Sequence, residues 1–185
     1  MESLIADGLI AGVLDITTTE LADELVGGIL SAGPDRLAAA GRAGIPQVIS
    51  VGACDMVNFG PPDTIPDSFA DRVFYQHNPT VTLMRTTVEE NREIGEEIGR
   101  KAAAATGPVT ILLPARGVSA IDADGQPFDN PAARDALFEA IRQHADDVAV
   151  ERLDLHINDD GFADRATELL IELMPFSREG ARSPG

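Results

Sequence analysis

Five polar motifs of this chain lie where predicted strands end or predicted helices begin, and their side chains could bind or transform a small molecule. They occupy residues 15–20, 31–36, 52–58, 77–78 and 114–119. In open α/β sheets the loops after parallel strands line one crevice, so these motifs are expected to form one ligand-binding rim. The candidate ligand-binding residues are Gly33, Arg36, Gly52, Asp55, Asn58, His77, Asn78, Arg85, Arg116, Gly117 and Ser119.

Two arginines are the best-placed cations of an otherwise acidic chain. A planar guanidinium can bind a carboxylate or a phosphate through two parallel hydrogen bonds. Gly117 and Ser119 would add a backbone amide and a hydroxyl beside Arg116, while Arg85 directly precedes a predicted helix. The alternatives are an i to i+4 ion pair of Arg85 with Glu89 and a solvated loop charge for Arg116.

The segment from Gly28 to Gly33 has the glycine spacing of a phosphate-binding loop, but it lacks the residues that complete one. Pro34 and Asp35 stand where Lys and Ser or Thr would bind the terminal phosphate and the metal, and G-x-G-x-x-G is absent. A helix that begins at Pro34 could still bind an anion through its free amides, with Arg36 in its first turn. Alternatively, Arg36 simply faces water.

Cys54 and His77 are the weak candidates for catalytic residues. An imidazole could remove the proton of a thiol, but nothing in the spacing brings these two side chains together. A single cysteine after an apolar strand is usually a small buried side chain, so we predict a structural Cys54. His77-Asn78-Pro79 is a turn signal that would expose both polar side chains. Neither H-E-x-x-H nor a cysteine cluster occurs, so no metal site is predicted.

Hydrophobic patterns predict alternating strands and helices along the chain. Apolar runs predict strands at 9–16, 47–51, 72–76, 109–113 and 148–155, the last at a sheet edge. Caps and periodicity predict helices at 18–26, from 34 to between 41 and 44, from 87 to 105, from 131 through 141, and from 159 through 173. This order implies a three-layer, Rossmann-like α/β fold with a mostly parallel sheet of about five strands and helices on both faces.

Two further segments are expected to lack regular structure. Residues 58–71 contain Pro61, Pro62 and Pro66, so they are predicted to form an irregular excursion over the rim, as a lid would. The tail from Ser177 is predicted to be disordered. The remainder, residues 1–176, is expected to form one α/β domain.

Composition restricts the class of partner. The 185 residues carry 14 basic and 31 acidic side chains, a net charge of −17, so nucleic acid and anionic membrane surfaces are poor partners. No apolar stretch reaches the length of about 20 residues that a membrane helix needs. One cysteine excludes an internal disulfide, and no charged-then-apolar leader follows Met1, so the cytoplasm is the expected location.

Long motifs of the chain resemble a known family. They lie at residues 12–28, 31–36, 52–59, 77–79, 83–87 and 117–122. In this order they are similar to the carboxy-terminal half of the Tm-one-like ATP-binding family, which is largely uncharacterised, and the resemblance covers about residues 4–175. It implies ATP as a candidate ligand and a preceding α/β domain as a partner. It implies no catalytic residue.

Three functions are compatible with these observations. The leading hypothesis is a domain that binds an anionic small molecule, such as a nucleotide, at the rim. The first alternative is a hydrolase or lyase that acts on a phosphorylated or carboxylated metabolite. The second is an assembly module whose rim is completed by the family's amino-terminal domain or by another subunit. A half-molecule that exposes apolar surface is also expected to form a homo-oligomer.

Overall fold

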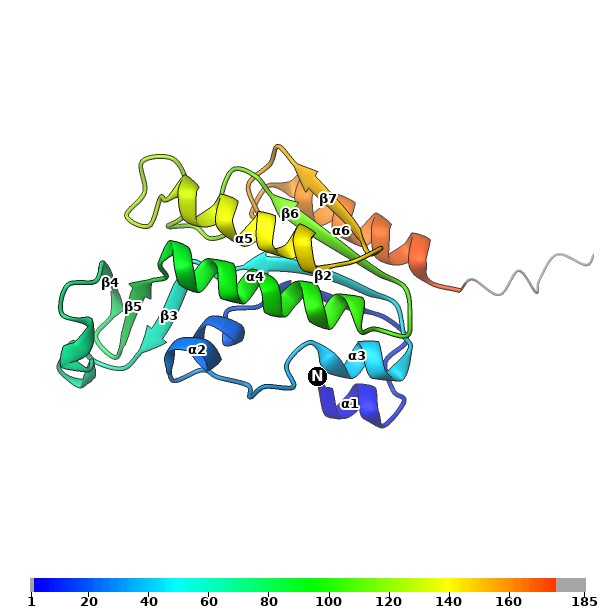
Figure 1. Ribbon diagram of the computed structural model, residues 1–185, viewed down its shortest axis with the longest axis horizontal. Coiled ribbons are helices and arrows are strands. Elements are labelled where there is room, and N and C mark those ends of the chain that lie inside the picture. The colour runs from blue at the N-terminus through cyan, green and yellow to red at the C-terminus, as the bar shows by residue number, and fades with distance from the viewer. Residues whose placement is uncertain (1, 176–185) are drawn as a thin grey trace, which may run out of the picture.

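The computed structural model describes residues 2–175, in which a four-stranded parallel sheet lies between two layers of helices (Figure 1). The predicted α/β class, with a mostly parallel sheet and helices on both faces, is confirmed. The strand order is β1-β2-β6-β7, so the last strand lies at an edge, as its alternating pattern predicted. These strands are β1 (Val13–Thr17), β2 (Gln47–Gly52), β6 (Val109–Pro114) and β7 (Ala149–Leu153).

Alternate residues of the central strands point into two different cores. Ile49 and Ile111 face the layer of α2, α4 and α5, whereas Val48 and Leu112 face α6, which lies behind the sheet in Figure 1. Phe162 of α6 is 1% exposed, and burial of a side chain of this size contributes about 2–3 kcal/mol. The helices are α1 (Glu2–Ala6), α2 (Glu20–Val26), α3 (Ala38–Ala43), α4 (Val88–Ala103), α5 (Pro131–His144) and α6 (Asp160–Leu173).

The predicted caps of α4 and α5 are present, whereas the capping box predicted from Thr17 and Glu20 is wrong, because α2 begins after Thr19 without a side-chain cap. Thr87 and Glu90 form a reciprocal capping box at the start of α4, and the side chain of Asn130 accepts the amide of Ala133 at the start of α5. The two helices approach closely because α4 carries Gly95, where a Cβ would lie 2.5 Å from the carbonyl oxygen of Leu137. This close contact fixes α4 and α5 as one layer over the sheet.

A second, antiparallel sheet was not predicted, and it changes the place of one strand. Its order is β3-β5-β4, with β3 (Met56–Phe59), β4 (Phe74–Asn78) and β5 (Val81–Arg85), and it forms one end of the molecule (Figure 1). The strand expected at 72–76 therefore pairs here as β4 and does not extend the parallel sheet. The reason is local, because a two-residue turn after Asn78 returns the chain directly as a hairpin.

Several boundaries also differ from the prediction. The helix expected from Pro34 begins at Ala38 after a turn, β1 begins at Val13 instead of residue 9, and α1 was not anticipated. Residues 58–71 contain two short 3₁₀ helices, η1 (Pro62–Thr64) and η2 (Asp67–Phe69). The tail predicted from Ser177 lies outside the described residues. Within 2–175, no helix has the length and apolarity needed to cross a bilayer.

Candidate functional site

The four loops that follow the parallel strands form one continuous rim, which contains three of the five motifs that were predicted to form it. The rim comprises residues 17–19, 52–55, 114–122 and 154–158, and backbone hydrogen bonds join each loop to the next. Amides donate from Thr18 to Gly52 at 2.9 Å, from Ala53 to Val118 at 2.9 Å and from Ile157 to Gly117 at 3.1 Å. Because these hydrogen bonds link each loop to the next, the rim has a fixed shape.

Two predicted glycines are required by the closeness of these loops. A Cβ on Gly52 would lie 2.5 Å from the carbonyl oxygen of Ile16. Gly117 has φ +143°, and its Cβ would lie 2.0 Å from the carbonyl oxygen of Asp122. Ala53 adopts φ 57°, a left-handed conformation that non-glycine residues seldom occupy and that is enriched at functional sites.

Beneath this surface lies a buried charge cluster, which we call the inner layer and which comprises Asp55, Arg85, Ser119, Asp122 and Arg134. The Ser119 hydroxyl donates to Asp55 Oδ2 at 2.7 Å. Asp122 accepts from Arg85 at 3.1 Å and from Arg134 at 2.8 Å. All five residues are at most 9% exposed. The sequence motifs contained Asp122 but gave no sign that it pairs with two arginines.

Arg85 is an internal structural cation, which corrects the expectation that it anchors a ligand. Its Nε donates to the carbonyl of Phe128 at 2.8 Å, and its Nη1 donates to the carbonyl of Asp55 at 3.1 Å. Its Nη2 takes part in the pair with Asp122. The alternative pair with Glu89 is also wrong, because Glu89 pairs with Arg92 on the surface. The cause is β5, which brings Arg85 into the interior.

Asp55 is the polar group of the inner layer with unused hydrogen-bonding capacity. Its Oδ1 is buried and has no hydrogen-bond partner among the described residues. Burial, with the nearby charge of Asp122, raises the pKa of Asp55 to about 6, against the opposing effects of Ser119 and Arg85. The carboxyl group therefore titrates much closer to neutral pH than an exposed aspartate does.

Cys54 is enclosed beside the rim and does not have the properties of a nucleophile. Its side chain is fully buried, with Sγ 3.2 Å from the hydroxyl of Thr18. Burial raises the pKa of the thiol to about 12, so the thiol stays protonated at neutral pH. The geometry agrees with the structural role predicted for this residue.

Arg36 and Asn58 lie in separate buried clusters next to the rim. Arg36 Nη1 donates to Asp15 at 2.7 Å, and Asn58 Nδ2 donates to Asp23 at 3.0 Å. The amide of Leu30 also donates to Asp23, at 3.1 Å. The loop with phosphate-loop spacing thus binds a carboxylate of its own chain, which corrects the idea of an anion site there. Gly33 lies in the exposed part of this loop, with φ +80°.

His77 and Asn78 lie on the exposed β4–β5 hairpin, apart from the rim. Asn78 Oδ1 accepts the amide of Thr80 at 2.8 Å, which stabilises the turn. In residues 2–175, no hydrogen bond or ion pair joins either side chain to the rim loops. The histidine that does reach the rim is His156, whose Nε2 lies 2.9 Å from the carbonyl oxygen of Ser119. Since its Nδ1 accepts the amide of Asn158, Nε2 carries the proton.

Above the inner layer, a set of solvent-accessible residues forms what we call the outer layer of the rim. Arg116 is the predicted arginine whose guanidinium reaches solvent, since its side chain is 61% exposed. It forms a bidentate pair with Asp154 at 2.9 and 2.7 Å. Solvent screens such a pair, so Arg116 can exchange this partner for a ligand at little cost. The outer layer comprises Thr17, Ala53, Arg116, Ala120 and Asn158.

The structure was also searched for groups of side chains that could bind a metal ion. In residues 2–175, no three His, Cys, Asp or Glu side chains are grouped so that they could hold one metal ion.

Comparisons with known proteins extend over nearly the whole chain. The model of "Uncharacterised protein family (UPF0261) C-terminal domain" matches residues 1–174. A UPF0261 protein of Clostridium tetani is 51% identical over 94% of the chain and 44% of its own length. One of Rhizobium meliloti is 52% identical over 90% of the chain and 42% of its own length. The tomato "ToMV resistance protein Tm-1(GCR237)" is 44% identical over 96% of the chain, but over only 24% of its own length.

Proposed function

Because this chain belongs to the uncharacterised family UPF0261, as its carboxy-terminal domain, we propose that it contributes one wall of a site for an anionic small molecule. The wall is the outer layer of the rim, and Arg116 is its cation. A nucleotide such as ATP is the first ligand to test, since the resemblance to Tm-one-like ATP-binding proteins suggests it. The cytoplasm is the proposed setting.

The observation that carries this proposal is the contrast in accessibility among three predicted arginines. Arg36 and Arg85 are 8% and 6% exposed and bind internal carboxylates. Arg116 alone of these three extends from the rim into solvent. In a chain of net charge −17, an exposed cation at the carboxyl ends of parallel strands is the best location for an anion.

A second polypeptide is part of the proposal. The chain spans less than half the length of the relatives it matches, between 24% and 44%. One arginine in an open rim gives a weak site, so further contacts are needed for tight binding. We propose that the family's amino-terminal domain supplies them, or else a second copy of this chain in the expected homo-oligomer.

The enzyme alternative receives no support from the described geometry. Cys54 is buried and protonated, and His77 lies on a hairpin outside the rim. The two weak catalytic candidates are thus not placed to act together, so we propose binding without assigning a reaction.

The test is ligand-dependent melting of the chain, alone and co-expressed with the amino-terminal domain, against ATP and a panel of phosphorylated and carboxylated metabolites. A ligand at 100 times its Kd adds about 2.7 kcal/mol of stability and raises Tm. Arg116→Ala should weaken the best ligand about tenfold. Arg42→Ala is the matched control, because Arg42 forms a similarly exposed pair with Asp35 elsewhere. Equal affinities of the two variants, or no stabilising ligand at millimolar concentration, would refute the proposal.

A further inference from the structure

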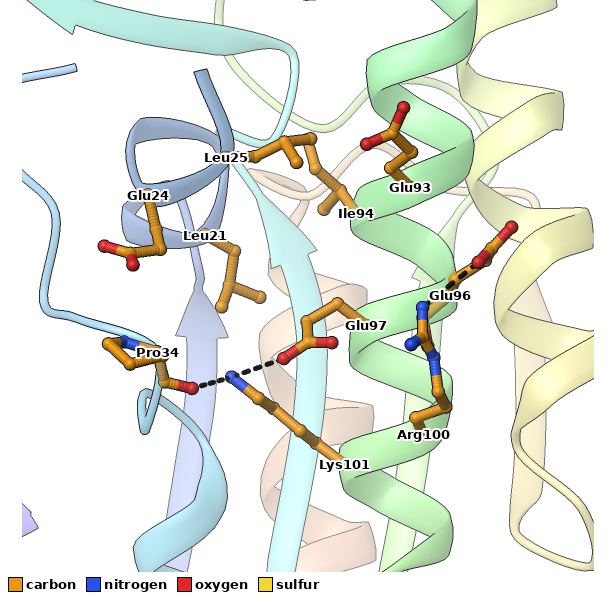
Figure 2. A pocket seen from close by; sticks show the side chains of 10 residues that line it. All are labelled: Leu21, Glu24, Leu25, Pro34, Glu93, Ile94, Glu96, Glu97, Arg100 and Lys101. Atoms are coloured by element: carbon orange, nitrogen blue, oxygen red, sulfur yellow. Dashed lines mark hydrogen bonds and ion pairs between the residues drawn. The ribbon is translucent and has the colours of Figure 1, made fainter. Parts of the chain in front are cut away.

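A long groove runs beside α4, on the far side of this helix from α5. One cavity of about 400 Å³ lies between α2 and α4 (Figure 2), and a second of about 300 Å³ lies between α3 and α4. Both cavities are lined by Pro34, Glu97, Arg100 and Lys101. We therefore describe them as one elongated depression, the α2–α4 groove.

The groove is apolar at its base and acidic at its edges. Figure 2 shows Leu21 and Leu25 of α2 opposite Ile94 of α4. The acidic side chains along this half are Glu24, Glu93, Glu96 and Glu97. An apolar base with charged edges is the arrangement by which proteins bind an amphipathic segment.

Arg42, Arg100 and Lys101 are the cations that line the groove, and each already pairs with a carboxylate. Lys101 Nζ donates to the carbonyls of Pro34 and Arg36 at 2.7 and 2.8 Å and pairs with Glu97 at 3.0 Å. Arg100 pairs with Glu96. Glu24 and Glu93 have no Arg or Lys partner among the described residues, and both are exposed. The α2 end of the groove thus has uncompensated negative charge.

Exposed apolar side chains also follow Leu25 along the chain. Leu25 is 41% exposed, and Ile29 and Leu30, in the loop after α2, are 61% and 51% exposed. Exposed apolar side chains beside charged ones are common at interaction surfaces.

We propose that the α2–α4 groove binds a basic amphipathic segment of a protein partner. An apolar side chain of that segment lies on Leu21, Leu25 and Ile94, and its lysines or arginines face Glu24 and Glu93. The charge of the edges selects this chemistry, because an acidic or phosphorylated segment would meet unpaired carboxylates. The site is separate from the rim, so it can be tested independently of the anion-binding proposal.

The probe is a synthetic peptide of about four helical turns, with leucines along one face and lysines beside them, measured by fluorescence anisotropy. A second peptide has glutamate in place of each lysine. Wild type should bind the lysine peptide more tightly than the glutamate peptide. Leu25→Asp, at an exposed position, should weaken the lysine peptide about tenfold or more. Glu93→Lys should weaken the lysine peptide severalfold and strengthen the glutamate peptide.

Glu89→Lys is the matched control, since it makes the same change of charge on α4 at an exposed residue outside the groove. It should alter the affinity for either peptide much less than Glu93→Lys does. Failure of the lysine peptide to bind at millimolar concentration would overturn the proposal. Equal effects of Glu89→Lys and Glu93→Lys would also overturn it, because they would indicate nonspecific attraction to an acidic protein.

Discussion

The inner and outer layers of the rim use the same kinds of side chain for different purposes. In the inner layer, Arg85 and Arg134 bind Asp122, whose side chain has no solvent exposure. In the outer layer, Arg116 pairs with Asp154, and both side chains are mostly in water. Burial makes the first set part of the architecture, because an unpaired charge there would be costly. Exposure leaves the second set free to change partners.

This difference explains why residue type and spacing alone misassign the arginines. Arg85 is the last residue of β5, Arg116 follows β6, and both stand beside small or polar residues. Their roles differ because the β5 hairpin folds Arg85 beneath the rim, whereas the loop after β6 leaves Arg116 on top.

The largest expected effect comes from removing the central cation of the inner layer. Arg85→Ala would leave the carbonyl of Phe128 without its hydrogen-bond donor. It would also remove one of the two arginines that neutralise the buried charge of Asp122. We expect a loss of about 3–5 kcal/mol in the free energy of unfolding, measured by urea denaturation. Arg116→Ala should change the urea midpoint far less. Similar midpoints for both variants would show that the two layers do not differ as described.

A smaller effect is expected from the pH dependence of the inner layer. The pKa of Asp55 is raised from 3.8 to about 6 in the folded state, so the folded protein binds this proton more tightly than the unfolded chain does. The stabilisation is therefore complete below about pH 4 and is lost as pH rises from about 4 to 6. A shift of this size corresponds to about 2–3 kcal/mol.

Asp55→Asn should remove this component, because the amide stays neutral over the whole range. We expect the variant to be more stable than wild type at pH 7 and to show a flatter dependence of urea midpoint on pH between 4 and 6. Asp154→Asn, at an exposed position whose pKa is lowered by Arg116, serves as the control and should retain the wild-type slope in this range. A wild-type slope in Asp55→Asn would contradict the assignment.

The parallel sheet could be predicted because its signals are local. Val109–Pro114 is apolar except for Thr110, and the helices that cover the sheet carry caps, at Thr87 and Asn130, whose partners lie within three residues. The antiparallel sheet was missed because β3 has only four residues, Met56–Phe59, and directly follows the rim. Such a short segment has no periodicity that separates it from a loop.

The site could be predicted only as a region. The loop positions of Gly52 and Gly117 followed from strand ends, and the structure places both in the rim. The bond between Ser119 and Asp55 joins residues 64 positions apart, so no local spacing encodes it. The same holds for the pair of Arg85 with Asp122, which are 37 positions apart. The division of one rim into buried and exposed layers is a property of tertiary packing.

The most direct test of the outer layer is an amide NMR titration of the chain with ATP at up to millimolar concentration, where even weak binding is visible. The account predicts shifts concentrated at Ala53, Gly117, Ala120 and Asn158, together with the side-chain Nε signal of Arg116, and their loss in Arg116→Ala. Arg85 should keep its signal, because its donors are engaged internally. Shifts confined to the loop at residues 27–37, or no shifts at all, would contradict an anion site at the rim.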